Sequence, residues 1–475
     1  MVILYFLGLS IVLALLVFFL WKTCIQWISS ILYLSAQIGL TWYAWQNPGQ
    51  SDSLYFRFDS LSILLNVLMS IILIPVFLHT RFYLQRHVRN IKMNGLFVGL
   101  LIILATSISA VYFADNIVLM WVCLEISTVA VTFLVFHERY PDALEAAWKY
   151  LFISSFGITL AFVGILFLSV QGQAGTEVSL SFSHLKSIAN QLDPFFLQIA
   201  FILILTGYSI KMNIFPLYAA AIDAKTAAPF PVNAITSSVL VNAGFLAIAR
   251  VYSIITQTAH AAWANHILMI VGMISLAIAT FQLFRVKRFK RMFAFSTMEH
   301  IALVCIALSL GKPGYFAALL HITLHTLAKT GMFLSFGQIR AYFQSGWIRD
   351  TGDYFKRNGF SAIVYLFGLL TITAIPPSGM FYSEFLIFKA LFAEGHYYIM
   401  VAVLVFLTII FYILFSYSMQ LLYGSIPENY QPEKSIVNKW EPVSQIILFV
   451  LVIYLAFFPP PIFTELLLSA MQLIS

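Results

Sequence analysis

Charged side chains are scarce in this sequence. They make up 9% of the 475 residues, whereas 61% are hydrophobic and the mean hydropathy is +0.92. A soluble domain carries about 25% charged residues, so the composition excludes a mainly soluble protein. Inside a bilayer the backbone groups must be satisfied within the chain, which helices achieve. The composition therefore predicts an all-α polytopic membrane protein.

Cysteine is also scarce. The three cysteines, Cys24, Cys123 and Cys305, are scattered, and no Cys-x-x-Cys occurs. This spacing argues against thiolate zinc or iron–sulfur sites, and no glycine-rich nucleotide fingerprint follows a predicted strand. We expect no cofactor, metal, redox centre or nucleotide on this chain. The net charge of +7 comes from basic residues in short loops, so we expect no nucleic acid partner.

Long apolar runs dominate instead. A helix needs roughly 20 apolar residues to cross a bilayer, and about fourteen runs qualify. The first continues into further spans without a small-residue cleavage site, so we interpret it as a helix rather than a removed signal. The predicted spans are 2–20, 25–45, 59–79, 95–113, 116–136, 150–170, 195–218, 230–252, 266–284, 293–311, 314–338, 360–391, 397–422 and 443–465.

Two spans are interrupted. The seventh breaks near Asn213 to Pro216, and the twelfth breaks at Pro376-Pro377-Ser378-Gly379, because proline removes a helical hydrogen bond. Paired broken helices are typical of inverted-repeat transporters with ion sites near the midplane. We predict two inverted five-helix repeats, spans four to eight and nine to thirteen. The predicted regions are 1–94 (spans one to three), 95–252 (first repeat), 253–422 (second repeat) and 423–475 (last span).

Basic loop residues predict the orientation. Nineteen of the 26 lysines and arginines follow odd-numbered spans, including Arg89, Lys225, Lys434 and Lys439. The opposite side carries only Arg57, Lys186, Arg250 and Lys312. Because cytoplasmic loops are enriched in Lys and Arg, we expect both termini outside a bacterial or archaeal cytoplasmic membrane.

Ionisable side chains within the spans are the main functional signal. Such groups are costly in hydrocarbon and usually mark ion pathways. His321, His325 and Lys329 recur every four residues, so they share one stripe of a helix. Other spans carry Glu125, Lys211, Glu299, His300 and Glu384.

These groups have the chemistry of a proton path. A low dielectric disfavours a charged amine and a nearby carboxylate favours it, so moving the carboxylate away releases a proton. Histidine titrates near physiological pH and can relay between lysines. Structural alternatives stay open: each charged group alone fits an ion pair, and each histidine fits a hydrogen bond to a neighbouring helix. Glu299 alternatively pairs with the basic loop at 285–291, and Lys389 is expected to snorkel at a helix end.

Five segments resemble a known family. They are Leu-Glu-Ala-Ala-Trp-Lys-Tyr at 144–150, Gly-Tyr-Ser-Ile-Lys-Met at 207–212, Phe-Lys-Arg-Met-Phe-Ala-Phe-Ser-Thr-Met-Glu-His at 289–300, His-x-x-x-His-x-x-x-Lys at 321–329 and Pro-Pro-Ser-Gly-Met-Phe-Tyr-Ser-Glu-Phe at 376–385. Over roughly residues 55–390 the chain resembles the antiporter-like membrane subunits of complex I, Mrp cation/proton antiporters and group 4 membrane-bound hydrogenases. The Glu299-His300 pair favours the hydrogenase-4 component F branch.

The resemblance implies a role for each ionisable group. Glu125 and Lys211 match the coupled pair of the first half-channel. Lys329 matches the central lysine, His321 and His325 its relay histidines, and Glu384 the terminal group of the second half-channel. Candidate accessory residues are Lys149, Asp223, Ser237, Glu299 and His300. The implied partners are other membrane subunits of a complex, including antiporter-like paralogues and a redox module, and the lipid bilayer.

Two segments depart from the family pattern. After the seventh-span break the family usually has His-Thr-Trp-Leu-Pro-Asp-Ala, of which only Asp223-Ala224 remains. Span eight carries Thr236, Ser237 and Ser238 where some relatives have a titratable relay. Hydroxyls orient water but hold no charge, so we expect passage between the half-channels to need water.

The leading hypothesis is a proton-translocating, non-redox subunit of a hydrogenase-4 or complex I type respiratory complex. Any oxidoreductase chemistry would then belong to other subunits. A Mrp-type cation/proton antiporter subunit would use the same residues without a redox partner. Two further hypotheses are the membrane subunit of an inorganic-carbon uptake system and a structural scaffold.

Overall fold

The structure, a computed structural model, describes residues 1–86, 91–171, 179–426, 438 and 440–474. Every named element in these residues is a helix, as the composition predicts. The chain folds into two compact units. Unit 1 comprises Met1–Val232, Val239–Ile267 and Glu465–Ser475, and unit 2 comprises Asn233–Ser238 and Leu268–Thr464.

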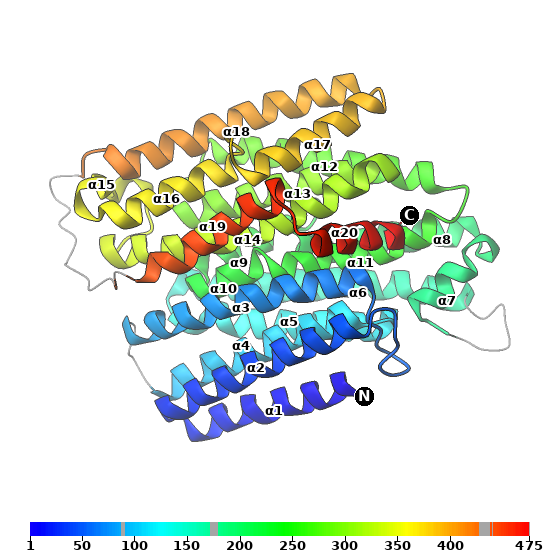
Figure 1. Cartoon of the computed structure of the whole chain (residues 1–475), viewed down its shortest axis with the longest axis horizontal. Coiled ribbons are helices and arrows are strands. Elements are labelled where there is room, and N and C mark those ends of the chain that lie inside the picture. Colours follow the sequence, from blue (N-terminus) through cyan, green and yellow to red (C-terminus); the bar gives the residue numbers. More distant parts are fainter. Residues whose placement is uncertain (87–90, 172–178, 427–437, 439, 475) are drawn as a thin grey trace. The chain divides into compact units, whose positions relative to one another are not determined.

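Unit 1 is a bundle of apolar helices. Its helices are α1 (Val2–Leu20), α2 (Thr23–Gln46), α3 (Ser60–Arg86), α4 (Ile91–Phe113), α5 (Ile117–Val135), η1 (Phe136–Glu138), α6 (Pro141–Gln171), α7 (Phe182–Ser187), η2 (Ala189–Gln191), α8 (Pro194–Met212), α9 (Tyr218–Ala227) and α11 (Val239–Ile255). Helix α4 packs against α1, α2 and α3, which are blue in Figure 1. Helix α6 packs against α5 and along α8.

Unit 2 is built around one long helix. Its helices are α13 (Phe289–Ser309), α14 (Lys312–Phe343), η3 (Ile348–Asp350), α15 (Tyr354–Arg357), α16 (Gly359–Ile372), α17 (Gly379–Ala393), α18 (Tyr397–Tyr423) and α19 (Glu441–Phe457). Helix α14 contacts α13, α16, α17 and α19 (Figure 1). Three helices have residues in both units: α10 (Phe230–Thr236), α12 (Ala261–Leu283) and α20 (Pro461–Ile474).

The helices account for the predicted spans to different degrees. Each predicted span overlaps a helix. Among the described residues, ten helical stretches are long and apolar enough to cross a membrane. An eleventh is the pair α19 and α20, which bends by 74° at its break. The number of fourteen spans and the inverted repeats therefore stay predictions.

Local interactions determine both ends of α8, and its C-terminal end is the break in the seventh predicted span. The Asp193 carboxylate caps α8 by accepting from the backbone N–H of Phe195 at 2.9 Å and of Phe196 at 3.4 Å. Helix α8 ends at Asn213, whose φ of 63° is left-handed, a conformation that asparagine tolerates. The chain becomes helical again at Tyr218. This break places Lys211 in the last turn of α8.

The break in the twelfth predicted span is built similarly. Helix α16 ends at Ile372, and Ala374 has a left-handed φ of 52°. After the two prolines, Ser378 Oγ accepts from Phe381 N at 3.2 Å and caps the start of α17. This break places Glu384 near the beginning of α17.

Two helix boundaries differ from the predictions. Span eight is divided after Thr236 into α10 and α11, although no proline marks that point. The predicted span 443–465 is wrong at its end, because α19 stops at Phe457 before a run of three prolines and α20 starts at Pro461. Proline lacks the backbone donor that a continuous helix needs there.

Two basic residues that were counted with the loop residues in predicting the orientation are in helices. Lys225 is in α9 with 4% exposure, and Arg250 is in α11 with 8% exposure. Asp223 also lies in α9, because the chain becomes helical again directly after the first break. Arg89, Lys434 and Lys439 lie outside the described residues. The orientation in the membrane stays a prediction.

Candidate functional site

Lys211 is a buried cation of unit 1. Its side chain is 2% exposed. Its Nζ donates to Thr128 Oγ1 at 2.6 Å, with Tyr150 OH at 3.3 Å and Ser127 Oγ at 3.4 Å. The same Nζ lies 5.4 Å from the centroid of the Tyr150 ring. Hydroxyls and one aromatic face therefore surround the ammonium.

Glu125 is the carboxylate that acts electrostatically on Lys211. It lies on α5 three residues before Thr128, and residues at that spacing share a helix face. Ser155 Oγ of α6 donates to Glu125 Oε1 at 3.0 Å. Glu125 Oε2 is buried and has no hydrogen-bond partner within the described part of the chain. Both members of the predicted pair thus lie in unit 1, with hydroxyls around the lysine.

Lys329 is the corresponding cation of unit 2. It is fully buried in the middle of α14. Its Nζ donates to Ser296 Oγ of α13 at 2.8 Å and lies 5.6 Å from the centroid of the Phe293 ring. The Glu299 carboxylate, one turn further along α13, acts electrostatically on it. Glu299 is itself buried, with 5% exposure.

Three histidines of unit 2 cluster beside Glu384. The His300 ring lies 5.4 Å from the His325 ring and 5.3 Å from the His321 ring, between centroids. His300 Nδ1 lies 3.8 Å from Glu384 Oε1. His321 Nδ1 is bonded to Ser383 Oγ at 2.9 Å. His300, which the sequence analysis gave only an accessory place, is therefore the member that contacts both other histidines and Glu384.

The other accessory candidates differ in where they lie. Lys149 has a 49% exposed side chain and pairs with Glu145 at 2.5 Å, so its neighbour Tyr150, not Lys149, reaches Lys211. Asp223 is partly buried in α9. Ser237 is buried between α10 and α11, and its Oγ has no hydrogen-bond partner among the residues described.

Six hydroxyl partners were not identified from the sequence. They are Ser127, Thr128, Tyr150, Ser155, Ser296 and Ser383. The available signal was helical spacing, since Ser296 lies three residues before Glu299 and Thr128 three residues after Glu125. Serine and threonine are common on packed membrane helices, so spacing alone did not separate these six residues from the other hydroxyls.

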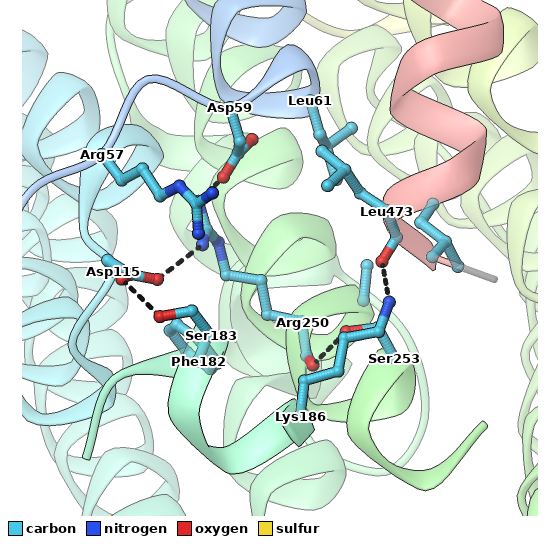
Figure 2. A pocket seen from close by; sticks show the side chains of 12 residues that line it. Arg57, Asp59, Leu61, Asp115, Phe182, Ser183, Lys186, Arg250, Ser253 and Leu473 are labelled. Atoms are coloured by element: carbon cyan, nitrogen blue, oxygen red, sulfur yellow. Dashed lines mark hydrogen bonds and ion pairs between the residues drawn. The ribbon is translucent and has the colours of Figure 1, made fainter. Parts of the chain in front are cut away.

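A separate ionic cluster lies in unit 1, shown in Figure 2. Arg250 Nη2 donates to Asp59 Oδ2 at 2.7 Å, and Nη1 lies 4.0 Å from Asp115 Oδ1. Arg250 also donates to Ser62 Oγ at 2.8 Å and to Tyr112 O at 3.1 Å. One arginine of α11 thereby holds the adjacent ends of α3, α4 and α5.

The same cluster lines a pocket of about 120 Å³. Three of the four basic residues predicted for one membrane side are in its lining: Arg57, Lys186 and Arg250. Lys186 Nζ donates to Leu473 O of α20 at 3.0 Å (Figure 2). Burial lowers the pKa of Lys186 below its usual range. The pocket is thus closed on one side by α20.

Comparison with known proteins identifies the family of this chain. Residues 114–411 match the family described as NADH:quinone oxidoreductase/Mrp antiporter, TM, which is more than half of the chain. The chain belongs to this family. The resemblance inferred from the five sequence segments is confirmed.

Two relatives are of the hydrogenase-4 kind. A hydrogenase-4 component F homolog from Methylacidiphilum infernorum (isolate V4) is 32% identical over 286 residues, covering 59% of this chain and 60% of that protein. Hydrogenase-4 component B from Escherichia coli (strain K12) is 28% identical over 360 residues, covering 73% of this chain and 52% of that protein. The alignments thus span between half and two thirds of these relatives.

A solved structure shares the fold along the whole length. One chain of the membrane-bound sulfane sulfur reductase, an archaeal respiratory membrane complex, superposes with a TM-score of 0.85 at 22% identity. The match covers 100% of this chain and 97% of that chain. This chain is therefore an antiporter-like membrane subunit related to complex I, Mrp and hydrogenase-4 proteins.

Proposed function

We propose that this subunit moves protons through the membrane along its buried Glu, Lys and His groups, within a hydrogenase-4 or complex I type respiratory complex. The observation that carries the proposal is one fully enclosed lysine in each unit, with a glutamate acting on each. Ionisable groups inside membrane helices are costly and mark ion pathways. The partners we propose are antiporter-like paralogues and a redox module that drives the movement.

In unit 1 the proton carrier is Lys211. A carboxylate stabilises a buried ammonium, so a change in the distance to Glu125 changes the proton affinity of the amine. Thr128 and Tyr150 each offer a hydroxyl that can accept from the amine and donate to water. These hydroxyls hold the amine in place while the proton leaves.

In unit 2 the route runs from Lys329 to Glu384. His325, His300 and His321 follow one another at ring distances of 5.4 and 5.3 Å. Neutral imidazole has both a donor and an acceptor nitrogen, so it can pass a proton on by exchanging tautomers. Glu384 keeps 12% of its side chain exposed and is the group from which the proton leaves. The two lysines act in series, joined through water.

The experiment compares Lys329→Met with Lys389→Met in the whole complex reconstituted into liposomes. Lys389 is an exposed lysine on α17, which makes it a matched control. Proton flux on turnover is expected to fall by roughly 100-fold or more in the first variant, the scale of one positioned proton-transfer group, and to be unchanged in the second.

A double variant that removes both buried charges distinguishes loss of proton transfer from misfolding. Lys329→Met leaves the buried Glu299 without its cation, and an uncompensated buried charge is destabilising. Lys329→Met with Glu299→Gln removes both charges, so it is expected to assemble and still to lose flux. Full flux in an assembled double variant would overturn the proposal.

The family match also favours a second candidate, a Mrp-type cation/proton antiporter subunit. It would exchange Na⁺ for H⁺ without redox turnover. Liposomes with an imposed Na⁺ gradient and no electron donor separate the two candidates. The respiratory proposal expects no proton movement there, whereas a Na⁺-driven flux that is lost in Lys329→Met supports the antiporter.

A further inference from the structure

Three ligand-type side chains from three helices meet in unit 2. They are His300 of α13, His321 of α14 and Glu384 of α17, each with one ligand atom within 4.8 Å of the other two. Imidazole nitrogen and carboxylate oxygen are the ligands of many protein zinc sites. No sequence spacing signals this set because its members lie on separate helices, and the sequence analysis predicted no metal.

The hydrogen bonds around His321 determine its tautomer. Ser383 Oγ donates to Met380 O at 2.9 Å, so it accepts from His321 Nδ1, also at 2.9 Å. Nδ1 therefore carries the proton and Nε2 the lone pair. Nε2 is fully buried, with no hydrogen-bond partner in the described residues. A histidine whose N–H is anchored in this way is arranged as metal-binding histidines are.

The distance between His300 and Glu384 also suits an ion. Nδ1 of His300 lies 3.8 Å from Glu384 Oε1. That separation is too long for a hydrogen bond. Two bonds to a central metal of about 2 Å each reach across it.

The ligand types and the exposure are compatible with a cation at this place. Glu384 offers a carboxylate oxygen beside two imidazole rings, a combination found in protein zinc sites. Its side chain is 12% exposed.

We propose that His300, His321 and Glu384 form a binding site for a divalent transition metal of the Zn²⁺ class. Three protein ligands leave a fourth position for water. Binding needs neither redox turnover nor proton movement. A functional consequence rests on the proposed function: the bound metal occupies the lone pairs that would pass the proton, so it stops proton flux.

The test titrates Co²⁺ alone into the purified whole complex and follows visible absorption. We expect one saturable site per copy of this chain, displaced by Zn²⁺, and lost in His321→Gln and in Glu384→Gln. The control is His396→Gln, because His396 is an exposed histidine of the same unit, two residues from the exposed Glu394. An unchanged signal in assembled His321→Gln overturns the proposal, as does loss of the signal in His396→Gln.

A second variant keeps the test decisive if the ligand variants fail to assemble. Ser383→Ala retains all three ligands but removes the anchor of His321 Nδ1. Loss of such a partner weakens metal affinity by about 10- to 100-fold, and that is the expected shift in the Co²⁺ midpoint. An unchanged midpoint contradicts the proposed site.

Proton flux separates this proposal from the proposed function. Zn²⁺ is expected to inhibit flux in the unaltered complex over the range in which it displaces Co²⁺. Co²⁺ binding at the three residues without inhibition supports the metal site and contradicts the proton route through them. Inhibition without any Co²⁺ site contradicts the metal site and leaves the route untouched.

Discussion

The ammonium of Lys211 contacts three hydroxyls, and they differ in strength. Thr128 is closest at 2.6 Å, while Tyr150 and Ser127 are at 3.3 and 3.4 Å. A hydrogen bond to a charged group contributes about 1.5–3 kcal/mol. Thr128 should therefore stabilise the protonated lysine more than the other two.

Thr128→Val tests this ranking, because valine keeps the shape and loses the hydroxyl. Proton flux is expected to fall by about tenfold or more, since 1.36 kcal/mol corresponds to one decade in a protonation equilibrium. Tyr150→Phe should reduce flux less, because the ring face 5.4 Å from Nζ remains. Flux measured in liposomes would contradict the ranking if Tyr150→Phe lost more than Thr128→Val.

At this scale the sequence predicted the charged residues better than their partners. Charged residues inside an apolar helix are rare, which makes four residues conspicuous: Glu125, Lys211, Lys329 and Glu384. Lys149 was named as an accessory candidate and its neighbour Tyr150 was not, but successive residues in a helix point about 100° apart. Only one of the two can face Lys211, and the structure shows that Tyr150 does.

The helices α6 and α8 approach so closely that only glycine fits between them. A Cβ on Gly207 would lie 2.3 Å from Gly157 O and 2.7 Å from Ala161 Cβ. Small residues of this kind let membrane helices pack at short range. The contact sets the position of Lys211, which lies one turn after Gly207 on α8.

Gly207→Ala should push α8 away from α6 and separate Lys211 from Tyr150. Overpacking of this kind costs about 1–3 kcal/mol, so both the unfolding midpoint of the complex and proton flux should fall. Gly39→Ala is the matched control, because a Cβ there meets nothing within 4 Å. Alanine is the better helix former by about 1 kcal/mol, so the control should be neutral or stabilising. Equal behaviour of the two variants would contradict the close approach.

Helix breaks were predictable only where proline marks them. Pro216 and the Pro376-Pro377 pair lie at the two predicted breaks, and the chain leaves the helix there. The division between α10 and α11 falls at Ser237-Ser238, whose hydroxyls compete for backbone hydrogen bonds without forbidding a helix. That break depends on tertiary packing, which cannot be predicted from a run of hydrophobic residues.

At the scale of a whole unit, Arg250 holds several helix ends together. Its side chain is 9% exposed, and that of Asp59 is 14% exposed. Breaking a buried ion pair costs about 3–5 kcal/mol, so Arg250→Met should markedly lower the unfolding midpoint of the complex. Arg349→Met is the control, because that arginine is 79% exposed.

A double variant identifies the cause. Arg250→Met alone leaves the Asp59 carboxylate without its cation. Adding Asp59→Asn removes that charge, so the double variant should recover part of the lost stability. A double variant less stable than the sum of the two single effects would show that the pair is not what holds these helices.

At the scale of the whole molecule, the sequence predicted the fold class and the family, but not which residues of different helices lie close together. Composition predicted a helical membrane protein, and five short segments predicted the family. The clustering of Arg57, Lys186 and Arg250 around one pocket was not predictable, because these residues are far apart in the sequence and meet only through helix packing. The meeting of His300, His321 and Glu384 likewise required the packing of three helices.

The central claim is that Lys211 and Lys329 carry the same proton in turn. The most direct test measures proton flux in liposomes for Lys211→Met, Lys329→Met and both together, with Lys149→Met as the exposed control. Carriers in series predict that each single variant abolishes flux, that the double variant is no worse, and that the control is unaffected. Single variants that each retain about half of the flux, or all of it, would contradict the account.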